Sequence, residues 1–582
     1  MPELKLQIES MLRDAAVTAF GPDVADTDPL VNPTNNPKFG DYQANLAMPL
    51  AKQLGKPPRD VAGVIVQELK DEQALLAQPP SIAGPGFINF FIHADALAKA
   101  AAAMLVDDRL GVVKAEHPKK IVVDYSSPNV AKEMHVGHLR STVIGDAVAR
   151  VLVFQGHDVI RQNHLGDWGT QFGMLIEHLT ETGQAEQDNV GDLTRLYKQS
   201  KARFDAEPEF AQRAKNRVVA LQAGDVATLA AWHRLVDQSQ DYFATIYDRM
   251  GVLLEPGDIR GESFYNDMLP GVIDQLKTDN ALEASQGAGV VFVDGFADKD
   301  GNPLPMIVQK SDGGYLYATT DLAAVGYRVD ELKADRVVYV VGAPQRQHFD
   351  MLFATVRKLG WAPDSVRLDF VPFGQVLGED GKIFRTRSGE TVRLVDLIDE
   401  AESRASAVCK EKNPELTDEE AATIGKVVGL GALKYADLSS DRIKDYRFSW
   451  ERMLALEGNT APYLINAYVR VHGIFRKGGI DFDAFTSVRV QVEDRHEKAL
   501  VLKLMQLGPT VASVADSLEP HRLCSFLYEL ASAFHKFFES CPVLRSDVPE
   551  DVRQGRLALC KLVALTLKRG LDLLGIGVVE RM

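Results

Sequence analysis

The stretch Asp124-Tyr-Ser-Ser-Pro-Asn-Val-Ala-Lys-Glu-Met-His-Val-Gly-His-Leu-Arg-Ser-Thr142 decides how this chain folds. It continues an apolar, β-branched run at Ile121–Tyr125 and leads into a helical pattern over Gly137–Phe154. His135 and His138 flank a glycine at the start of that helix. A helix start offers free N–H groups and a positive dipole, and a glycine lets a phosphate approach the backbone. The stretch therefore predicts a phosphate-handling site at a strand-to-helix turn.

Strands and helices alternate from residue 118 to about residue 395, which predicts a doubly wound, Rossmann-type parallel sheet. In such a sheet ligands bind at the carboxyl ends of the strands. Polar helices at about 177–261 interrupt the alternation and are expected to be an insertion. The expected strands, most of them apolar and β-branched as buried parallel strands are, are Ile121–Tyr125, Asp158–Arg161, Val290–Val293, Val337–Val341 and Val366–Val371.

The flanking regions differ from this α/β part. Residues 1–117 predict a small α+β domain that closes with a Gly-Pro-Gly turn and a strand. Residues 396–582 predict an all-α helical bundle, with long amphipathic patterns and a capped helix start near Pro462. The fold class expected is therefore a multidomain α/β protein with a Rossmann-type catalytic domain.

The composition excludes several classes of protein. The 582 residues are 46% hydrophobic and 25% charged, as in ordinary globular proteins, and no apolar run approaches the roughly 20 residues of a membrane span. The N-terminus lacks a signal-peptide pattern, so a cytoplasmic enzyme is expected. A net charge of −16 argues against binding nucleic acid through a global field. The four cysteines are scattered, so neither structural zinc nor a disulfide framework is expected.

Several blocks together resemble the class I arginyl-tRNA synthetases, and the resemblance spans essentially the whole chain. Besides Ser126–Thr142, they are Phe39-Gly-Asp-Tyr-Gln43, Arg161-Gln-Asn-His-Leu-Gly-Asp-Trp-Gly-Thr-Gln-Phe-Gly-Met174, Tyr317-Ala-Thr-Thr-Asp-Leu-Ala-Ala324, Tyr339-Val-Val-Gly-Ala-Pro-Gln-Arg-Gln-His-Phe349, Gly458-Asn-Thr-Ala-Pro-Tyr463 and Glu580-Arg-Met582. The resemblance implies that arginine and ATP form arginyl-adenylate, and that the arginyl group then moves to the terminal ribose of tRNA(Arg).

The resemblance assigns catalysis to His135, His138 and Lys132, with Gly137 also at the ATP phosphates. A second signature loop corresponds to Gly378–Gly389, where Lys382, Arg385 and Arg387 are expected to contact ATP. The usual second lysine of that loop is replaced by Thr386, and Lys132 matches the lysine that substitutes for it in such family members. The alternatives are that the two histidines are ordinary polar residues at a helix start and that the second loop is only a solvated basic loop.

Arginine recognition requires an acceptor for a planar guanidinium, ideally a carboxylate. Asp321 resembles the family's guanidinium partner, and Tyr317 lies one helical turn before it. His348 matches a position near the ATP ribose, with a packed or capping histidine as the alternative. The resemblance implies that arginine contacts Ser127, Asn129, His135, Tyr317, Asp321 and Gln345.

Two regions are expected to bind tRNA. The C-terminal bundle would bind the anticodon through cations and aromatic rings, which hold phosphates and stack on bases: Arg442, Tyr463, Arg470 and Arg476. The N-terminal domain would contact the tRNA elbow through Asn36, Phe39 and Gln43. For any single one of these residues, a core aromatic, a solvated cation or a structured loop is an equally good interpretation.

ATP chemistry implies Mg²⁺, although no dedicated cluster marks metal ligands. A monomer is the family default. Two other functions remain open: another class I synthetase or a nucleotidyltransferase with the same histidine motif, and a catalytically idle relative that only binds tRNA or proteins.

Overall fold

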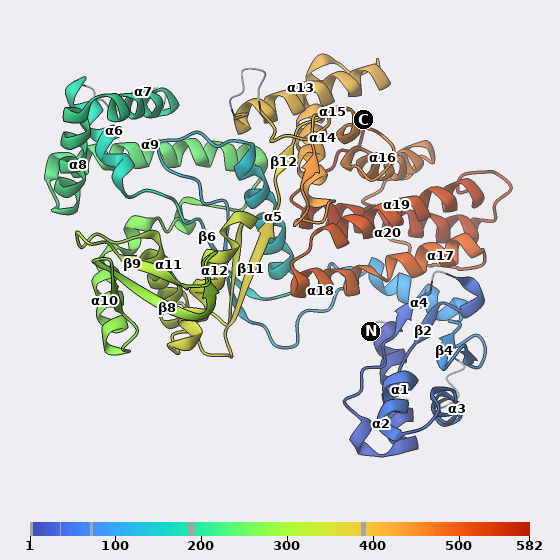
Figure 1. Ribbon diagram of the computed structural model, residues 1–582. Helices are drawn as coiled ribbons and strands as arrows, with labels where there is room; N and C mark the ends of the chain where they lie inside the picture. The colour runs from blue at the N-terminus through green and yellow to red at the C-terminus, as the bar shows by residue number, and fades with distance from the viewer. Residues whose placement is uncertain (1–3, 35, 70–73, 184–192, 386–390) are drawn as a thin grey trace.

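The computed structural model describes residues 4–34, 36–69, 74–183, 193–385 and 391–582 (Figure 1). A small N-terminal α+β unit lies beside the C-terminal helices, and a parallel sheet with flanking helices makes up the middle of the chain (Figure 1). The multidomain α/β fold class is confirmed.

The central sheet has the order β11–β10–β5–β6 and is parallel throughout. Its strands lie within a residue or two of four expected ones: β5 (Lys120–Asp124), β6 (Asp158–Gln162), β10 (Arg336–Gly342) and β11 (Arg367–Phe373). Helix α5 (Val136–Phe154) connects β5 to β6 and packs closely on the sheet. A Cβ on Gly145 of α5 would lie 2.2 Å from the Cβ of Tyr125, so only glycine permits this approach.

The fifth expected strand was wrongly assigned to the parallel sheet. Val290–Val293 lies in β8 (Ala288–Ala297), which pairs antiparallel with β7 (Glu283–Ser285) and β9 (Pro303–Gln309) in a separate sheet. Gln286 and Gly287 both have positive φ, at 51° and 82°, and form the tight turn that joins β7 to β8. Such a two-residue turn joins antiparallel neighbours, whereas the apolar run looks the same in either kind of sheet.

The interruption predicted at about 177–261 is helical. It contains α6 (Thr170–Glu181), which starts before it, α7 (Leu193–Ala206), α8 (Pro208–Gln222) and α9 (Val226–Met250). Glu177 on α6 is largely buried and forms ion pairs with Arg213 and Arg217 of α8, at 3.2 and 2.9 Å. Helix α9 forms hydrogen bonds with the loop after β5 through Ser239 and Tyr247.

Three helices pack on one face of the central sheet. They are α10 (Leu269–Thr278), which lies before β7 in the chain, α11 (Tyr317–Gly326), which lies between β9 and β10, and α12 (Arg346–Lys358), which lies between β10 and β11. These helices and β8 share a second apolar core that includes Val291, Leu322 and Leu352.

The N-terminal unit contains a four-stranded sheet of order β1–β2–β4–β3. Its elements are α1 (Leu4–Phe20), β1 (Asn32–Pro33), β2 (Tyr42–Ala44), α2 (Ala47–Leu54), α3 (Pro58–Glu68), β3 (Ser81–Ala83), β4 (Phe87–Phe90) and α4 (Ala94–Leu105). Helix α4 packs against α17 and α20 of the C-terminal part. An ion pair between Lys498 and Asp41, 2.8 Å long, joins the same two parts.

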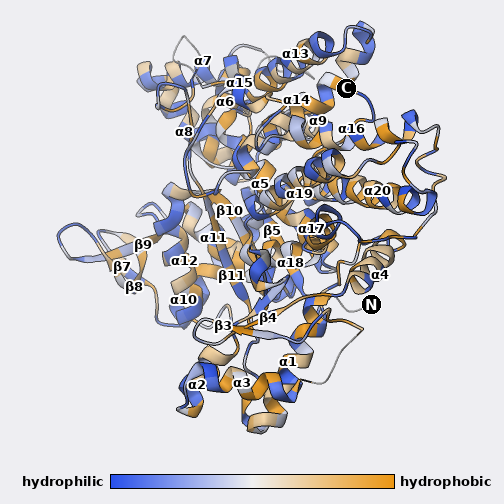
Figure 2. Cartoon of the chain, turned by 90° about the vertical axis from the view of Figure 1, so that its right-hand side faces the viewer, coloured by the Kyte–Doolittle hydropathy of each residue, from blue (hydrophilic) through white to orange (hydrophobic). Residues whose placement is uncertain are grey.

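The C-terminal part is a bundle of α13 (Leu394–Lys412), α14 (Asp418–Leu438), α15 (Trp450–Met453), α16 (Ala461–Lys477), α17 (Arg495–Leu504), α18 (Leu507–Ser517), α19 (His521–Ser540) and α20 (Glu550–Leu573). Hydrophobic residues lie between these helices and polar residues on their outer surfaces (Figure 2). One short parallel ladder interrupts the expected all-helical pattern, because β13 (Tyr446–Arg447) pairs with β12 (Val376–Leu377).

All four cysteines are buried and free. Among the described residues, no helix has both the length and the apolar character needed to cross a bilayer.

Candidate active site

The loop after β5 has an unusual backbone. Ser126, Ser127 and Ala131 have φ values of 72°, 48° and 61°, a left-handed conformation that costs about 1–3 kcal/mol per non-glycine residue. Hydrogen bonds hold the loop in place: Ser126 Oγ lies 2.7 Å from the Tyr247 hydroxyl of α9, and Ser127 N donates to Asn163 Oδ1 at 3.0 Å. The loop is therefore preset before any ligand arrives.

Asn129 lies at the exposed tip of this loop. It forms a parallel bridge with Gly166, whose carbonyl accepts from Val130 N at 3.1 Å. A Cβ on Gly166 would lie 2.2 Å from Asn129 Oδ1. The segment Asn163–Gly166, part of a block that carries the family resemblance, therefore sets the position of the Asn129 amide.

The two histidines cap the start of α5. Nδ1 of His135 accepts from Gly137 N at 3.0 Å, and Nδ1 of His138 accepts from His135 N at 3.1 Å. Their ring centroids lie 4.0 Å apart. In a neutral ring whose Nδ1 accepts, the proton is on Nε2. Each imidazole therefore keeps an Nε2–H donor that makes no hydrogen bond with another described residue and can serve a ligand.

Both rings are neutral at physiological pH. Burial and the neighbouring Lys132 charge lower the pKa of His135. Burial, and to a smaller extent His135, lowers the pKa of His138 to about 3. A Cβ on Gly137 would lie only 2.8 Å from Cε1 of His135, so the glycine also makes room for that ring. The sequence motif is thus both a helix cap and a pair of hydrogen-bond donors.

Three of the predicted ligand-binding side chains meet at α11 and α12. Asp321 Oδ2 lies 2.6 Å from His348 Nε2, and the His348 and Tyr317 ring centroids are 4.8 Å apart. Tyr317 and Asp321 belong to α11 and His348 to α12. Gln345 is exposed in the short helical turn Ala343–Gln345 just before α12. Carboxylate, phenol and imidazole thus lie together at one edge of the central sheet.

Glu262 belongs to this region and was missed by the sequence reasoning. Burial, then the charges of Asp167 and Asp321, raises the pKa of its carboxyl to about 7. Glu262 begins the 3-10 helix Glu262–Met268, just after the predicted insertion, and no local motif marks it. Three carboxyl groups that repel one another in a partly buried site favour a cationic ligand.

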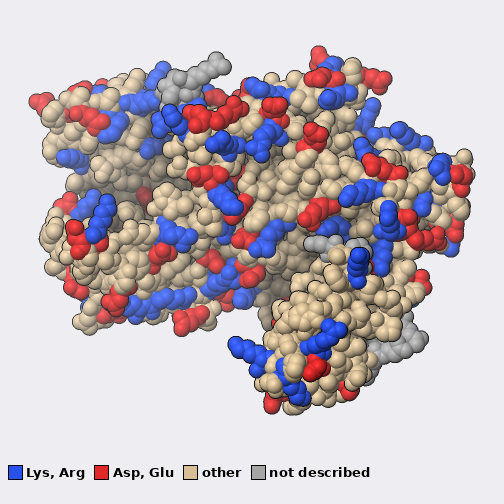
Figure 3. Space-filling model, turned by 45° about the vertical axis from the view of Figure 1, so that its right-hand side comes forward, with Lys and Arg blue, Asp and Glu red and all other residues tan. Residues whose placement is uncertain are grey.

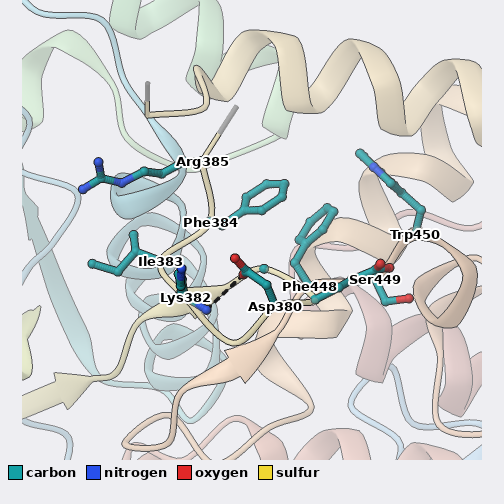
Figure 4. A pocket seen from close by; sticks show the side chains of 10 residues that line it. Asp380, Lys382, Ile383, Phe384, Arg385, Phe448, Ser449 and Trp450 are labelled. Atoms are coloured by element: carbon teal, nitrogen blue, oxygen red, sulfur yellow. Dashed lines mark hydrogen bonds between the residues drawn. The ribbon is translucent and has the colours of Figure 1, made fainter. Parts of the chain in front are cut away.

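The second loop lines a cavity of about 790 Å³ together with Phe448, Ser449 and Trp450 (Figure 4). The Phe384 ring stacks on Phe448 with centroids 4.6 Å apart, which fixes the loop near its end. Lys382 and Arg385 are exposed, and Lys382 N donates to Asp380 Oδ1 at 3.0 Å. Arg387, expected to contact ATP, lies outside the described residues, as does Thr386.

The chain that follows the second loop touches the first motif. Val136 N donates to Val392 O at 3.0 Å, and Leu394 N donates to Met134 O at 2.8 Å. The Arg393 guanidinium adds an ion pair to Glu133, 3.4 Å long. Two segments about 250 residues apart in the sequence are therefore brought together.

Lys132 has a partner in the helical insertion. Its Nζ lies over the Tyr197 ring of α7, 4.5 Å from the centroid, in a cation–π contact. Among the described residues, Lys132 makes no hydrogen bond to His135 or His138. Its positive charge nevertheless contributes to the lowered pKa of both rings.

The residues predicted to bind tRNA lie in two separate regions, and several make contacts within the protein. Arg442 Nε donates to Leu518 O at 3.1 Å, Tyr463 Oη lies 3.0 Å from His535 Nδ1, Arg470 lies over the Phe538 ring at 5.8 Å, and Arg476 donates to Glu580 O at 3.0 Å. In the N-terminal unit, Asn36 and Phe39 are exposed, whereas Gln43 bonds Asn89 at 2.7 Å. Basic and acidic side chains are interspersed on the face in Figure 3.

Three family models match successive parts of the chain. The catalytic domain of class I (R) tRNA synthetases matches residues 100–450, the DALR anticodon binding domain matches residues 464–582, and the arginyl tRNA synthetase N terminal domain matches residues 3–92.

Curated relatives match over the whole chain. The arginine–tRNA ligase of Synechococcus sp. is 50% identical over 586 residues, covering 99% of each chain, and that of Thermobifida fusca is 50% identical over 574 residues, covering 98% of each. The crystal structure of arginyl-tRNA synthetase from Plasmodium falciparum superposes with a TM-score of 0.85 at 29% identity, over 100% of each chain. The Thermus thermophilus arginyl-tRNA synthetase, at 24% identity, shares the fold with a TM-score of 0.81 over 99% of this chain and 100% of that one. This chain is a member of the class I arginyl-tRNA synthetase family.

Proposed function

We propose that this chain is an arginine–tRNA ligase that uses ATP to form arginyl-adenylate and then transfers the arginyl group to the 3′-terminal ribose of tRNA(Arg). The observation that carries the proposal is the pairing of two sites at one edge of the sheet. Helix-capping histidines with free Nε2–H donors suit a triphosphate, and the carboxyl group of Asp321 suits a guanidinium.

In the first step the arginine carboxylate attacks the α-phosphorus of ATP and pyrophosphate leaves with the electrons of the broken P–O bond. His135 and His138 would donate Nε2–H bonds to phosphate oxygens as charge spreads over them. Neutral rings with a fixed proton position can do so without rearrangement. ATP would enter as its Mg²⁺ complex, because Mg²⁺ binds mainly through phosphates and water.

Lys132 would supply the mobile cation that the second loop lacks at Thr386. An ammonium acts as a point charge, so reaching the phosphate matters more than the segment that carries it. If the Lys132 ammonium binds a phosphate, it must leave the Tyr197 ring when ATP binds. The second loop would contact the phosphates through Lys382, Arg385 and Arg387. Gly137 would let the phosphates approach the backbone at the start of α5.

Arginine selection would depend on Asp321, with Tyr317, Gln345 and the newly identified Glu262 around the guanidinium. Ser127, Asn129 and His135 would hold the α-amino and carboxylate end. A site built to pair a guanidinium leaves buried acceptors unpaired when another amino acid enters, which gives strong selectivity. His348 would face the ATP ribose while orienting the Asp321 carboxylate.

The division of labour proposed for the chain is elbow binding by residues 1–117, catalysis by 118–395 with the insertion at about 177–261, and anticodon binding by 396–582. The family models that match 3–92, 100–450 and 464–582 support the order of the three parts, but the catalytic model extends to residue 450 and so includes residues 396–450. The tRNA contacts proposed are Asn36, Phe39 and Gln43 at the elbow and Arg442, Tyr463, Arg470 and Arg476 at the anticodon. We further propose that the protein acts as a cytoplasmic monomer.

Amino-acid-dependent exchange of pyrophosphate into ATP tests the proposal. The assay is run with each of the twenty amino acids, with and without tRNA, so that a requirement for tRNA in the activation step is detected. Exchange with arginine alone is expected. Exchange with a different amino acid would assign another synthetase activity, and no exchange under any condition would favour the idle relative.

A further inference from the structure

Arg140 of helix α5 contacts segments that lie about 230 to 300 residues away in the sequence. It lies two residues after His138, and its side chain is 1% exposed. Its Nε donates to both carboxylate oxygens of Asp437 on α14, at 3.2 and 3.1 Å. Its Nη1 donates to the carbonyl of Lys444 at 3.0 Å. Asp437 is fully buried, so this ion pair is shielded from water.

The same guanidinium faces the base of the second loop. Its Cζ lies 5.2 Å from the Tyr446 ring centroid and 6.0 Å from that of Phe373. Tyr446 pairs with Val376 in the β12–β13 ladder, and the second loop leaves β12 directly after Leu377. One side chain therefore touches the helix that starts at the histidines, the strand pair that carries the second loop, and a helix of the C-terminal bundle.

A buried ion pair of this kind contributes little net stability to a fold. Apolar side chains of similar volume often stabilise a protein as well or better, because they avoid the desolvation of two charges. A planar guanidinium offers something that apolar packing lacks: several donors whose directions are fixed relative to one another. Asp437 accepts hydrogen bonds from Nε of Arg140, and the carbonyl of Lys444 accepts one from Nη1. Because these donors are fixed in one plane, the guanidinium links the positions of the two backbone segments.

We infer that Arg140, held by Asp437, is a positioning residue that sets the spacing between the helix start at His135–His138 and the second loop, so that both reach the ATP triphosphate together. The inference rests on the proposed function, since it takes ATP as the substrate. His135 is the one proposed arginine contact at the start of α5. The others lie in the loop after β5, on α11, at Gln345 and at Glu262, and Arg140 contacts none of these among the hydrogen bonds and ring contacts of the described residues. Loss of the Arg140–Asp437 pair should therefore impair ATP use and spare arginine use.

The chain offers a matched control on the same helix. Lys434 lies three residues before Asp437, is also buried on α14, and donates to Gly575 O at 2.7 Å. Burial lowers the pKa of the Lys434 ammonium to about 8; the charge of Asp146 opposes this shift and that of Arg150 adds to it. Among its described contacts none reaches β12, β13 or the second loop. Lys434→Met and Asp437→Asn therefore each disturb a buried polar contact near α5, and the second also disturbs the base of the loop.

The experiment measures pyrophosphate exchange of the full-length protein with arginine and tRNA, together with thermal unfolding. For Asp437→Asn the KM for ATP should rise about tenfold or more, and the KM for arginine should stay within about twofold. Lys434→Met should lower the Tm by a comparable amount and change neither KM. Adenosine, which lacks phosphates, should bind wild type and Asp437→Asn equally in equilibrium dialysis.

Equal rises of both KM values, or the same kinetic change in Lys434→Met, would show that the ion pair serves stability alone and would overturn the inference. If Asp437→Asn does not fold, Arg140→Lys carries the test. It keeps the charge opposite Asp437 but lacks the fork that also reaches Lys444, and the same rise in the KM for ATP is expected. Wild-type protein without arginine-dependent exchange would refute the proposed function itself, a result distinct from either kinetic pattern.

Discussion

His348 Nε2 lies 2.6 Å from Oδ2 of Asp321, so the carboxylate proposed to bind a guanidinium already has a hydrogen-bond partner in the protein. The contact orients the carboxylate, because the imidazole is itself packed against the Tyr317 and Phe349 rings. One carboxylate can accept several hydrogen bonds, so arginine binding need not displace the histidine.

The first prediction concerns Asp321→Asn, which removes the negative charge and keeps the size of the side chain. The KM for arginine should rise by about 100-fold, corresponding to about 3 kcal/mol for charge-assisted bonds lost in a partly buried site. The KM for ATP should change less than about threefold. Pyrophosphate exchange at varied arginine and ATP measures both, and equal changes would refute the guanidinium role.

The second prediction concerns the pH dependence that Glu262 produces. Its pKa of about 7 means that much of the free protein carries the neutral carboxyl at pH 6. If the ionised form binds the guanidinium, kcat/KM for arginine should rise with pH and level off above about 7. Calorimetry at pH 6 in buffers of different ionisation enthalpy should detect proton release when arginine binds.

Glu262→Gln provides the control for this pH effect. A carboxyl whose pKa is higher in the folded than in the unfolded protein binds protons more tightly when folded, so its contribution to stability falls as pH rises from about 4.5 to about 7. The variant should lose both the proton release and this decline of Tm with pH. Unchanged proton release would assign the effect to another group.

The third prediction separates stability from activity at Gly137. A Cβ there would lie 2.8 Å from the His135 ring, which must move and break its bond to Gly137 N. Gly137→Ala should lower the exchange rate by about 10- to 100-fold while the Tm holds or rises, since alanine favours helix by about 1 kcal/mol. Gly473→Ala in α16, where the nearest atom would be 3.9 Å away, should leave the rate unchanged.

The fourth prediction ranks the two candidate lysines. Lys132→Met should reduce the exchange rate by about 100-fold and Lys382→Met by less than about threefold, because Lys132 affects both histidine rings whereas Lys382 lies exposed on its loop. Single-turnover adenylate formation at saturating ATP would separate chemistry from binding. A larger loss of rate in Lys382→Met than in Lys132→Met would assign the phosphate-binding role to the second loop.

Periodicity was sufficient to predict the parallel sheet and the C-terminal helices, because buried strands and amphipathic helices leave local patterns. It failed for Val290–Val293, where a two-residue turn at Gln286 rather than the apolar run decides the pairing. The histidine motif was predicted as a helix start, and its two rings do cap α5. Glu262 and the Tyr197 contact of Lys132 left no local signal, since both depend on segments that meet only in the folded chain.

The left-handed backbone at Ser126, Ser127 and Ala131 has a consequence for how this protein could be engineered. Glycine adopts that conformation at little cost, but at Ser126 it would also remove the Oγ hydrogen bonds to Thr142 and Tyr247. The same change would free a loop that hydrogen bonds now hold in one shape, and arginine would then have to order it. Relief of backbone strain and a preset loop are therefore in competition at these residues, and selection for turnover would retain the strained side chains.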